Sequence, residues 1–234
     1  MNRPYVICYM VMSVDGKVTG DFLFRPEAEK ATEIYYEINR RYKADAYACG
    51  RITMEESFTQ KWYPDLSNYE SFLSDLDLKS DFICGESDRF YAVAFDPKGK
   101  LGWKSNRITD DDPGYGGARI IEVLTQQVDA RYLSYLKETQ IPYIFAGETE
   151  TDVSLALFKL KEFFKIETLL LEGGSVINGA FQRADTIDEL SLVVCSSVAG
   201  KNSKPLFTNS EISDYELVKA KTQEGVLVLN YKRK

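Results

Sequence analysis

Apolar residues along the chain alternate between two spacings, one typical of buried strands and one typical of helices. The segment 5–12, YVICYMVM, is a continuous run of apolar and β-forming residues, as expected for a strand buried on both faces of a mostly parallel sheet. Over Pro26–Tyr42 the apolar residues recur at intervals that place them on one helical face. Pro26, Glu27 and Glu29 suit the first turn of such a helix. The chain therefore begins with a strand followed by a helix.

The same alternation continues through the rest of the chain. It predicts strands at 44–49, 90–95, 120–124, 142–146, 167–171 and 189–195, and helices that begin near Thr53 and cover 131–137, 154–164 and 176–183. Two last strands, 215–220 and 226–231, have no helix between them. They are close enough to form an antiparallel pair at one edge of a sheet.

Strands that alternate with helices predict an α/β protein, here a three-layer sandwich with a mixed, mostly parallel central sheet. We expect one domain over residues 1–234, with a surface insert around 60–118. Within that insert, Lys98–Gly117 contains the turn-rich run DDDPGYGG. This segment is predicted to be a long surface loop.

Composition excludes several kinds of chemistry. The 234 residues are 44% hydrophobic and 28% charged, and none is histidine. Without histidine, Ser-His-Asp and Cys-His nucleophile systems, imidazole metal ligands and the histidine-containing zinc deaminase motif are excluded. The four cysteines form no CxxC pair, so we expect reduced thiols, a cytoplasmic location and no metal site. The net charge of −7 argues against a nucleic-acid groove, and the start MNRPYVICYM predicts neither a signal peptide nor a membrane span.

The strongest chemical signal is LLLEGGSVINGAF at 169–181, where a buried strand ends in two glycines before an amphipathic helix. Gly173 and Gly174 would let the backbone approach an anion without a Cβ clash, and the helix N-terminus would favour negative charge. Ser175 is expected to cap that helix. A simple strand-to-helix turn is the alternative, because the motif is not a complete GxGxxG.

A second strand-to-helix junction, ACGRITMEESF at 48–58, repeats this logic with Gly50, Arg51 and Thr53. A guanidinium binds phosphate through charge-assisted hydrogen bonds, and two anion sites suggest one long ligand such as a dinucleotide. Alternatively, Arg51 is a surface side chain and Thr53 an ordinary cap.

A third motif, MSVDGKV at 12–18, places Ser13 and Asp15 just beyond the first strand. Open α/β sheets bind ligands at that end of their strands. The alternative is an ordinary D-G turn.

Together, YVICYMVMSVDGKV, DAYACGRITMEES and TLLLEGGSVINGAFQRADTIDELSLVV resemble the reductase domain of riboflavin biosynthesis, a family whose fold is similar to dihydrofolate reductase. The resemblance implies NADPH as hydride donor and a homodimer. It also implies the site residues: cofactor phosphates at Gly50, Arg51 and Thr53, and the cofactor pyrophosphate at Gly173, Gly174, Ser175 and Val176.

On the substrate side, Glu172 matches a carboxylate that faces the substrate, and Ser13 and Asp15 match the loop beside the nicotinamide. We therefore expect Glu172 and Asp15 to be catalytic and Ser13 to bind substrate. A carboxyl suits this position, because hydride delivery to a ring carbon leaves negative charge on a ring nitrogen. A nearby carboxyl could supply or organise the proton that this nitrogen needs.

Two positions depart from the family pattern. The family usually has a lysine where Tyr9 stands, and often an acidic residue where Ser57 stands. Tyr9 is accordingly predicted to lie at the substrate. The sequence as a whole predicts an NADPH-dependent reductase of a small pyrimidine- or pteridine-like heterocycle, similar to 5-amino-6-(5-phosphoribosylamino)uracil reductase. A non-catalytic nucleotide-binding or regulatory protein on the same fold is the main alternative, and a reductase of carbonyl compounds a third.

Overall fold

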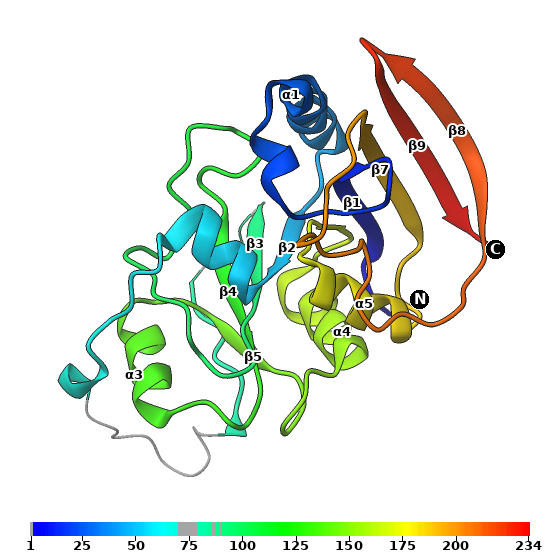
Figure 1. Ribbon diagram of the computed structural model, residues 1–234. Helices are drawn as coiled ribbons and strands as arrows, with labels where there is room; N and C mark the ends of the chain where they lie inside the picture. Colours follow the sequence, from blue (N-terminus) through cyan, green and yellow to red (C-terminus); the bar gives the residue numbers. More distant parts are fainter. Residues whose placement is uncertain (1, 70–78, 86–87, 89) are drawn as a thin grey trace. The chain divides into compact units, whose positions relative to one another are not determined.

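The computed structural model describes residues 2–69, 79–85, 88 and 90–234. The chain divides into two compact units, which are coloured along the sequence in Figure 1. The first unit contains residues 1–4 and 45–167, and the second contains residues 5–44 and 168–234. The expectation of a single domain with an insert around 60–118 remains a prediction, and residues 70–78, 86–87 and 89 of that insert lie outside the described part of the chain.

The first unit is built on four parallel strands in the order β5-β4-β3-β2. Its elements are β2 (Ala46–Gly50), α2 (Arg51–Met54), the π-helical turn η2 (Glu55–Thr59), the 3₁₀ turn η3 (Leu66–Asn68), β3 (Tyr91–Phe95), β4 (Arg119–Leu124), α3 (Ala130–Glu138), β5 (Tyr143–Phe145) and α4 (Val153–Phe164). The strands are buried along nearly their whole length, which agrees with their largely apolar sequence. Strand β4 also buries two charged residues, Arg119 and Glu122.

Helices α3 and α4 cover opposite faces of this sheet. On β4, Glu122 accepts a hydrogen bond from Tyr132 of α3 at 3.3 Å. Arg119, three residues earlier on the strand, pairs with Tyr91 of β3, whose ring contacts Phe164 of α4. Because strand residues three apart point to opposite faces, the unit has the helix–sheet–helix layering of a three-layer sandwich.

One loop of the first unit differs from its prediction. The segment 98–117 does not simply run over the surface, because Leu101, Trp103, Ile108 and Tyr115 are buried. The loop is held against α3, where the Tyr132 hydroxyl donates to the Leu101 carbonyl at 2.8 Å. Apolar residues spaced irregularly among turn residues gave no periodic signal for this packing.

The second unit contains strands in the order β6-β1-β7-β9-β8. Its elements are β1 (Tyr5–Ser13), the 3₁₀ turn η1 (Asp21–Phe24), α1 (Pro26–Tyr42), β6 (Thr168–Leu171), α5 (Ser175–Arg183), β7 (Glu189–Cys195), β8 (Tyr215–Gln223) and β9 (Val226–Arg233). Strands β6, β1 and β7 are parallel, whereas β9 is antiparallel to β7 and to β8. The α/β class and the mixed, mostly parallel strand pairing are therefore confirmed.

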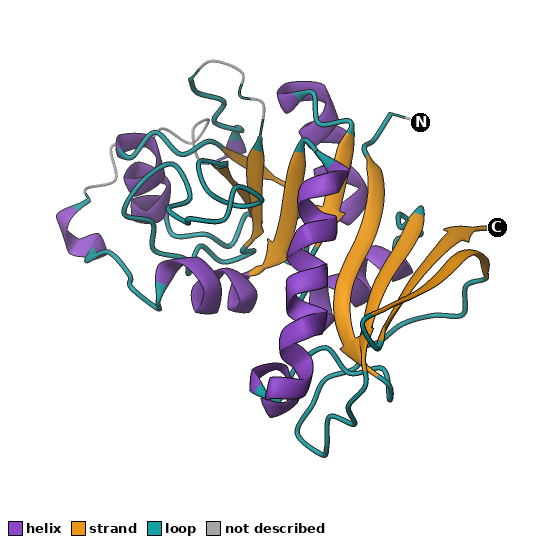
Figure 2. Ribbon diagram, turned by 90° about the horizontal axis from the view of Figure 1, so that it is seen from above, coloured by secondary structure: helices purple, strands orange, loops and turns teal. Residues whose placement is uncertain are grey.

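Helix α1 lies along one face of the second unit's strands, as Figure 2 shows. Tyr9 of β1 points to this face and stacks on Tyr35 of α1. Its neighbour Met10 points the other way, toward Gly173 in the turn before α5. Alternate residues of β1 thus point to the two faces of the sheet, one toward α1 and the other toward the turn before α5. Across the described residues, no helix combines the length and the apolar character needed to cross a bilayer.

Candidate functional site

The two glycines after β6 form the turn that leads into α5. Gly173 has φ +90°, a conformation that residues with a side chain rarely adopt. A Cβ added there would also lie 3.0 Å from Cε of Met10. The peptide bond between Gly173 and Gly174 is cis. The local backbone thus requires glycine at position 173.

Helix α5 begins without a side-chain cap, which corrects the prediction for Ser175. Gly174 is the N-cap residue, and among the described residues no side-chain cap hydrogen bond is formed there. The Ser175 hydroxyl instead contacts the Pro205 carbonyl and lies 2.6 Å from Oγ1 of Thr208. Both partners belong to the segment 196–214, which packs on α5. The first helix N–H groups, which lack intrahelical acceptors, are therefore left for a ligand or solvent.

A buried acceptor lies next to this turn. Asn178 on α5 is fully buried, and its Nδ2 donates to the Leu206 carbonyl at 3.2 Å. Its Oδ1 has no hydrogen-bond partner among the described residues. The conformation of Gly173, the uncapped helix start and this acceptor fit a ligand that carries both phosphate and hydroxyl or amide groups.

Glu172 directly precedes the glycine turn and is only 7% exposed. Its Oε1 accepts a hydrogen bond from Nδ2 of Asn39 on α1 at 2.6 Å, and Asn39 is also buried. Asn39 was not predicted from the sequence, because it lies 133 residues from Glu172 and belongs to no motif. Its polar character on the apolar face of α1 was the available signal.

Tyr9 is completely buried. Its hydroxyl donates to the Tyr35 carbonyl, and its ring stacks on Tyr35 at a centroid distance of 4.3 Å and an interplanar angle of 5°. Burial, and secondarily the charge of Glu172, raise the pKa of Tyr9, so the hydroxyl stays protonated. A substrate could touch this side chain only if its surroundings moved.

Ser13 and Asp15 come together in one hydrogen-bonded turn after β1. The Ser13 hydroxyl donates to Oδ1 of Asp15 at 2.6 Å and accepts from the Lys17 backbone at 3.0 Å. Oδ1 of Asp15 also accepts from the Ala199 backbone at 3.0 Å. The hydrogen bond from Ser13 is the main reason that the pKa of Asp15 is lowered. Asp15 is therefore an ionised acceptor at neutral pH.

In the first unit, Gly50 ends β2 and is the N-cap residue of α2, which has only four residues. Nη1 of Arg51 lies 2.6 Å from Oε1 of Glu55, one helical turn later. Thr53 is within α2 and caps nothing, and Ser57 is exposed. The predicted phosphate ligand Arg51 thus has a carboxylate partner, which the spacing of four residues in the sequence could have indicated.

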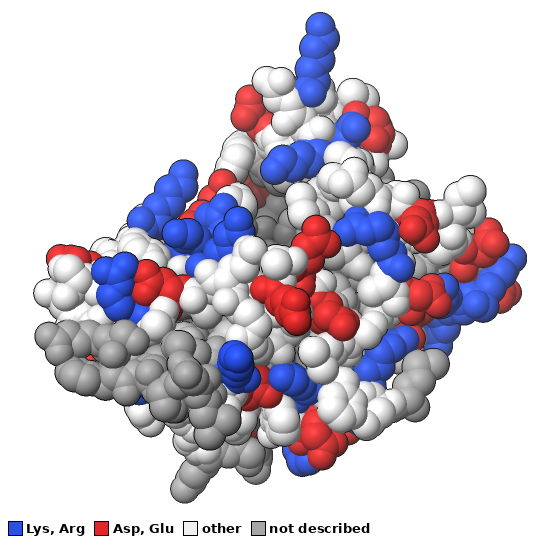
Figure 3. All heavy atoms as spheres, turned by 90° about the horizontal axis from the view of Figure 1, so that it is seen from below, with Lys and Arg blue, Asp and Glu red and all other residues white. Residues whose placement is uncertain are grey.

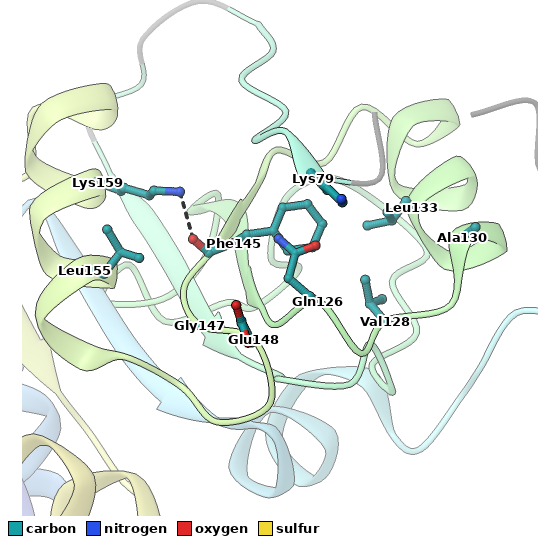
Figure 4. Close-up of a pocket in the computed structure, with 10 residues that line it drawn as sticks. All are labelled: Lys79, Gln126, Val128, Ala130, Leu133, Phe145, Gly147, Glu148, Leu155 and Lys159. Atoms are coloured by element: carbon teal, nitrogen blue, oxygen red, sulfur yellow. Dashed lines mark hydrogen bonds between the residues drawn. The ribbon is translucent and has the colours of Figure 1, made fainter. Parts of the chain in front are cut away.

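The first unit also has a surface depression at the carboxyl ends of β4 and β5. It encloses about 790 Å³ and lies between α3 and α4, as Figure 4 shows. Phe145 forms its apolar base, and Lys159 at its wall is bound to Asp81 at 2.8 Å. None of the residues predicted from sequence lines it.

The face of the molecule drawn in Figure 3 carries charges of both signs. Lys and Arg side chains are interspersed there with Asp and Glu. Such mixing favours solubility over long-range attraction of a polyanion.

Comparison with known proteins gives one family and several similar structures. Residues 114–229, just under half of the chain, match the RibD C-terminal domain family. No curated protein matches the sequence significantly. RibD from Acinetobacter baumannii has a similar structure, with TM-score 0.68 and 14% identity, over 100% of this chain and 59% of that one. This chain therefore spans about three fifths of that RibD.

Two further similar structures are shorter proteins. A pyrimidine reductase-like protein from Corynebacterium diphtheriae has TM-score 0.69 and 16% identity, and the similarity covers 100% of this chain and 93% of that one. The riboflavin biosynthesis reductase Rib7 from Saccharomyces cerevisiae has TM-score 0.58 and 18% identity, with 100% and 91% covered. At these identities the likeness establishes a shared fold.

Proposed function

We propose that the protein is an NADPH-dependent reductase of a small heterocycle, because residues 114–229 match the RibD C-terminal domain family. The observation that carries the proposal is the turn Glu172–Ser175, where a glycine in the left-handed region leads into an uncapped helix start directly after a buried carboxyl. This turn combines an anion site with a carboxyl that can exchange a proton.

The phosphates of the cofactor would be held by backbone groups and one guanidinium. Gly173 and Gly174 would give close access to the diphosphate, and the N–H groups of Ser175 and Val176 would donate to it. Gly50, Arg51 and Thr53 would hold a further phosphate. When bound, NADPH supplies the hydride.

Glu172 would supply or orient the proton that the ring requires after hydride transfer. The side chain is shielded from water and held by Asn39, so its carboxyl is oriented before substrate arrives. Asp15, kept ionised by Ser13, would accept a hydrogen bond from the substrate or nicotinamide and would not donate a proton.

We propose a pyrimidine- or pteridine-like substrate, by similarity to 5-amino-6-(5-phosphoribosylamino)uracil reductase. We also propose that the protein is cytoplasmic and forms a homodimer. Light scattering of the purified protein tests the dimer, and cell fractionation tests the location.

A direct assay tests the function. We expect saturable quenching or enhancement of NADPH fluorescence, with weaker NADH binding, and oxidation of NADPH by an aminouracil phosphate or by dihydrofolate. Absence of NADPH binding would refute the proposal. The full burial of Tyr9 favours the second candidate, a nucleotide-binding protein without catalysis, and NADPH binding without turnover across heterocycles and carbonyl compounds would select it.

A further inference from the structure

Glu172 is held by a chain of contacts that begins on β1 and passes through α1. Nδ2 of Asn39 donates to its Oε1 at 2.6 Å. Asn39 lies one helical turn after Tyr35 in α1. The Tyr9 hydroxyl donates a hydrogen bond to the Tyr35 carbonyl. All these groups belong to the second unit.

The hydrogen bond from Asn39 restricts one end of a side chain whose backbone is already fixed. Glu172 lies between the end of β6 and the constrained Gly173. Its backbone is therefore set by the turn, whereas its side chain still has three rotatable bonds. The hydrogen bond from the buried Asn39 amide fixes the carboxyl in one orientation.

Tyr9 holds the part of α1 that presents Asn39. In an α-helix, the carbonyl of Tyr35 is the one that accepts the N–H of Asn39, four residues later. The Tyr9 hydroxyl bonds to this same carbonyl. The Tyr9 ring stacks on Tyr35 and meets Tyr42 edge-on at 5.6 Å. Both the hydroxyl and the ring therefore tie β1 to the turn that carries Asn39.

We propose that Asn39 is a positioning residue that orients the Glu172 carboxyl for proton transfer, and that Tyr9 positions Asn39 in place of contacting substrate. This inference rests on the proposed function for its catalytic meaning, but the arrangement itself can be measured without turnover. It assigns Tyr9, where the related reductases usually have lysine, a role inside the protein.

The first test uses no cofactor and no substrate. The protein is labelled with glutamate carrying ¹³C at the side-chain carboxyl, and the Glu172 signal is assigned by its loss in Glu172→Gln. We expect Asn39→Leu to shift this signal, and Tyr9→Phe to shift it in the same direction by less. The matched control, Tyr42→Phe, removes a hydroxyl that bonds to Glu189 at 3.3 Å, and it should leave the signal in place. An unchanged Glu172 signal in folded Asn39→Leu overturns the proposal.

The second test separates positioning from general stability. Asn39→Leu should lower kcat by about 10- to 100-fold while the Kd for NADPH changes less than about twofold, because misorientation of a reacting group costs rate more than cofactor binding. Asn39→Asp, which is isosteric but lacks the donor, should lose as much. In Glu172→Gln, adding Asn39→Leu should lower kcat no further, because the two residues act as one unit.

Thr32→Val is the stability control, since it removes a 3.1 Å side-chain hydrogen bond within α1 itself. It should lower the melting temperature without changing kcat. Equal losses of kcat in Thr32→Val and Asn39→Leu would assign Asn39 a merely structural role and overturn the proposal. If the unmodified protein reduces no substrate, the proposed function fails, whereas the carboxyl shifts still decide whether Asn39 and Tyr9 orient Glu172.

Discussion

The carboxyl of Asp96, just beyond β3, interacts with that of Glu122 on β4 in the interior of the first unit, and both residues are fully buried. Oδ1 of Asp96 and Oε2 of Glu122 have no hydrogen-bond partner among the described residues. Burial and then the charge of Asp96 raise the pKa of Glu122 well above its usual range. Burial also raises the pKa of Asp96, to about 6.

This shift predicts how stability depends on pH. Below about pH 4, Asp96 is protonated in both the folded and the unfolded chain. Between there and about pH 6, the unfolded chain releases the proton while the folded protein keeps it. The free energy of unfolding should therefore fall as pH rises through this window, by up to about 3 kcal/mol from this group.

Urea denaturation across that window tests the prediction with Asp96→Asn, which keeps an oxygen that can accept the 2.7 Å hydrogen bond from the Leu101 backbone. The variant should lose much of the pH dependence. The exposed Asp111→Asn is the control and should retain it. Parallel curves for Asp96→Asn and the unmodified protein would contradict the assignment.

Arg51 predicts a difference between the two nicotinamide cofactors. Its replacement by alanine should weaken NADPH binding about tenfold and leave NADH binding nearly unchanged, because the guanidinium would bind the additional phosphate. Glu55→Gln removes the carboxylate that lies 2.6 Å from Arg51 and should strengthen NADPH binding or leave it as it is. Calorimetric titration of both cofactors decides; equal weakening of NADPH and NADH would remove Arg51 from the proposed site.

Gly174→Asp is predicted to weaken NADPH binding strongly, by about tenfold or more. The new carboxylate would lie at the start of α5, where it would take the helix N–H groups and repel phosphate. Calorimetry gives the affinity, and Ser210→Asp adds the same charge at an exposed position as a control. Unchanged affinity in Gly174→Asp would exclude this turn as the diphosphate site.

Glu172→Gln should reduce turnover much more than cofactor binding. The amide is close to isosteric and can still accept from Asn39, but it cannot supply the proton, so we expect a loss of about 100-fold or more in kcat. Single-turnover oxidation of NADPH, together with the Kd for NADPH, measures the two effects separately. If both change equally, Glu172 supports the turn and takes no part in the reaction.

Regular elements were predictable because their signals are local. Helix α1 covers Pro26–Tyr42 and β7 covers Glu189–Cys195, the same bounds that the sequence predicted. Proline at a helix start and an uninterrupted apolar strand both act within a few residues. The antiparallel pair β8 and β9 is also confirmed at a sheet edge.

Long-range partners were not predictable. The Glu172 carboxyl and the Asn39 amide are brought together only by folding, and the same holds for the Ser175 hydroxyl and Thr208. For Ser175, the preference of serine for the N-cap position predicted a cap. In the structure its hydroxyl instead contacts the hydroxyl of Thr208, 33 residues away. The roles of the predicted site residues likewise depend on ligands, and they remain predictions for the assays above.

Gly179, in the middle of α5, faces the same residue, Thr208, that the Ser175 hydroxyl contacts. A Cβ at this position would overlap the carbonyl oxygen of Thr208, so main chain meets main chain with no room for a methyl group. A mutational scan would therefore score Gly179 as intolerant, although it belongs to none of the proposed binding groups. Intolerance to substitution alone would then make Gly179 look like a ligand contact. Titrating a Gly179 variant with NADPH and NADH distinguishes the two cases, because a residue needed only for close packing of the backbone does not discriminate between the cofactors.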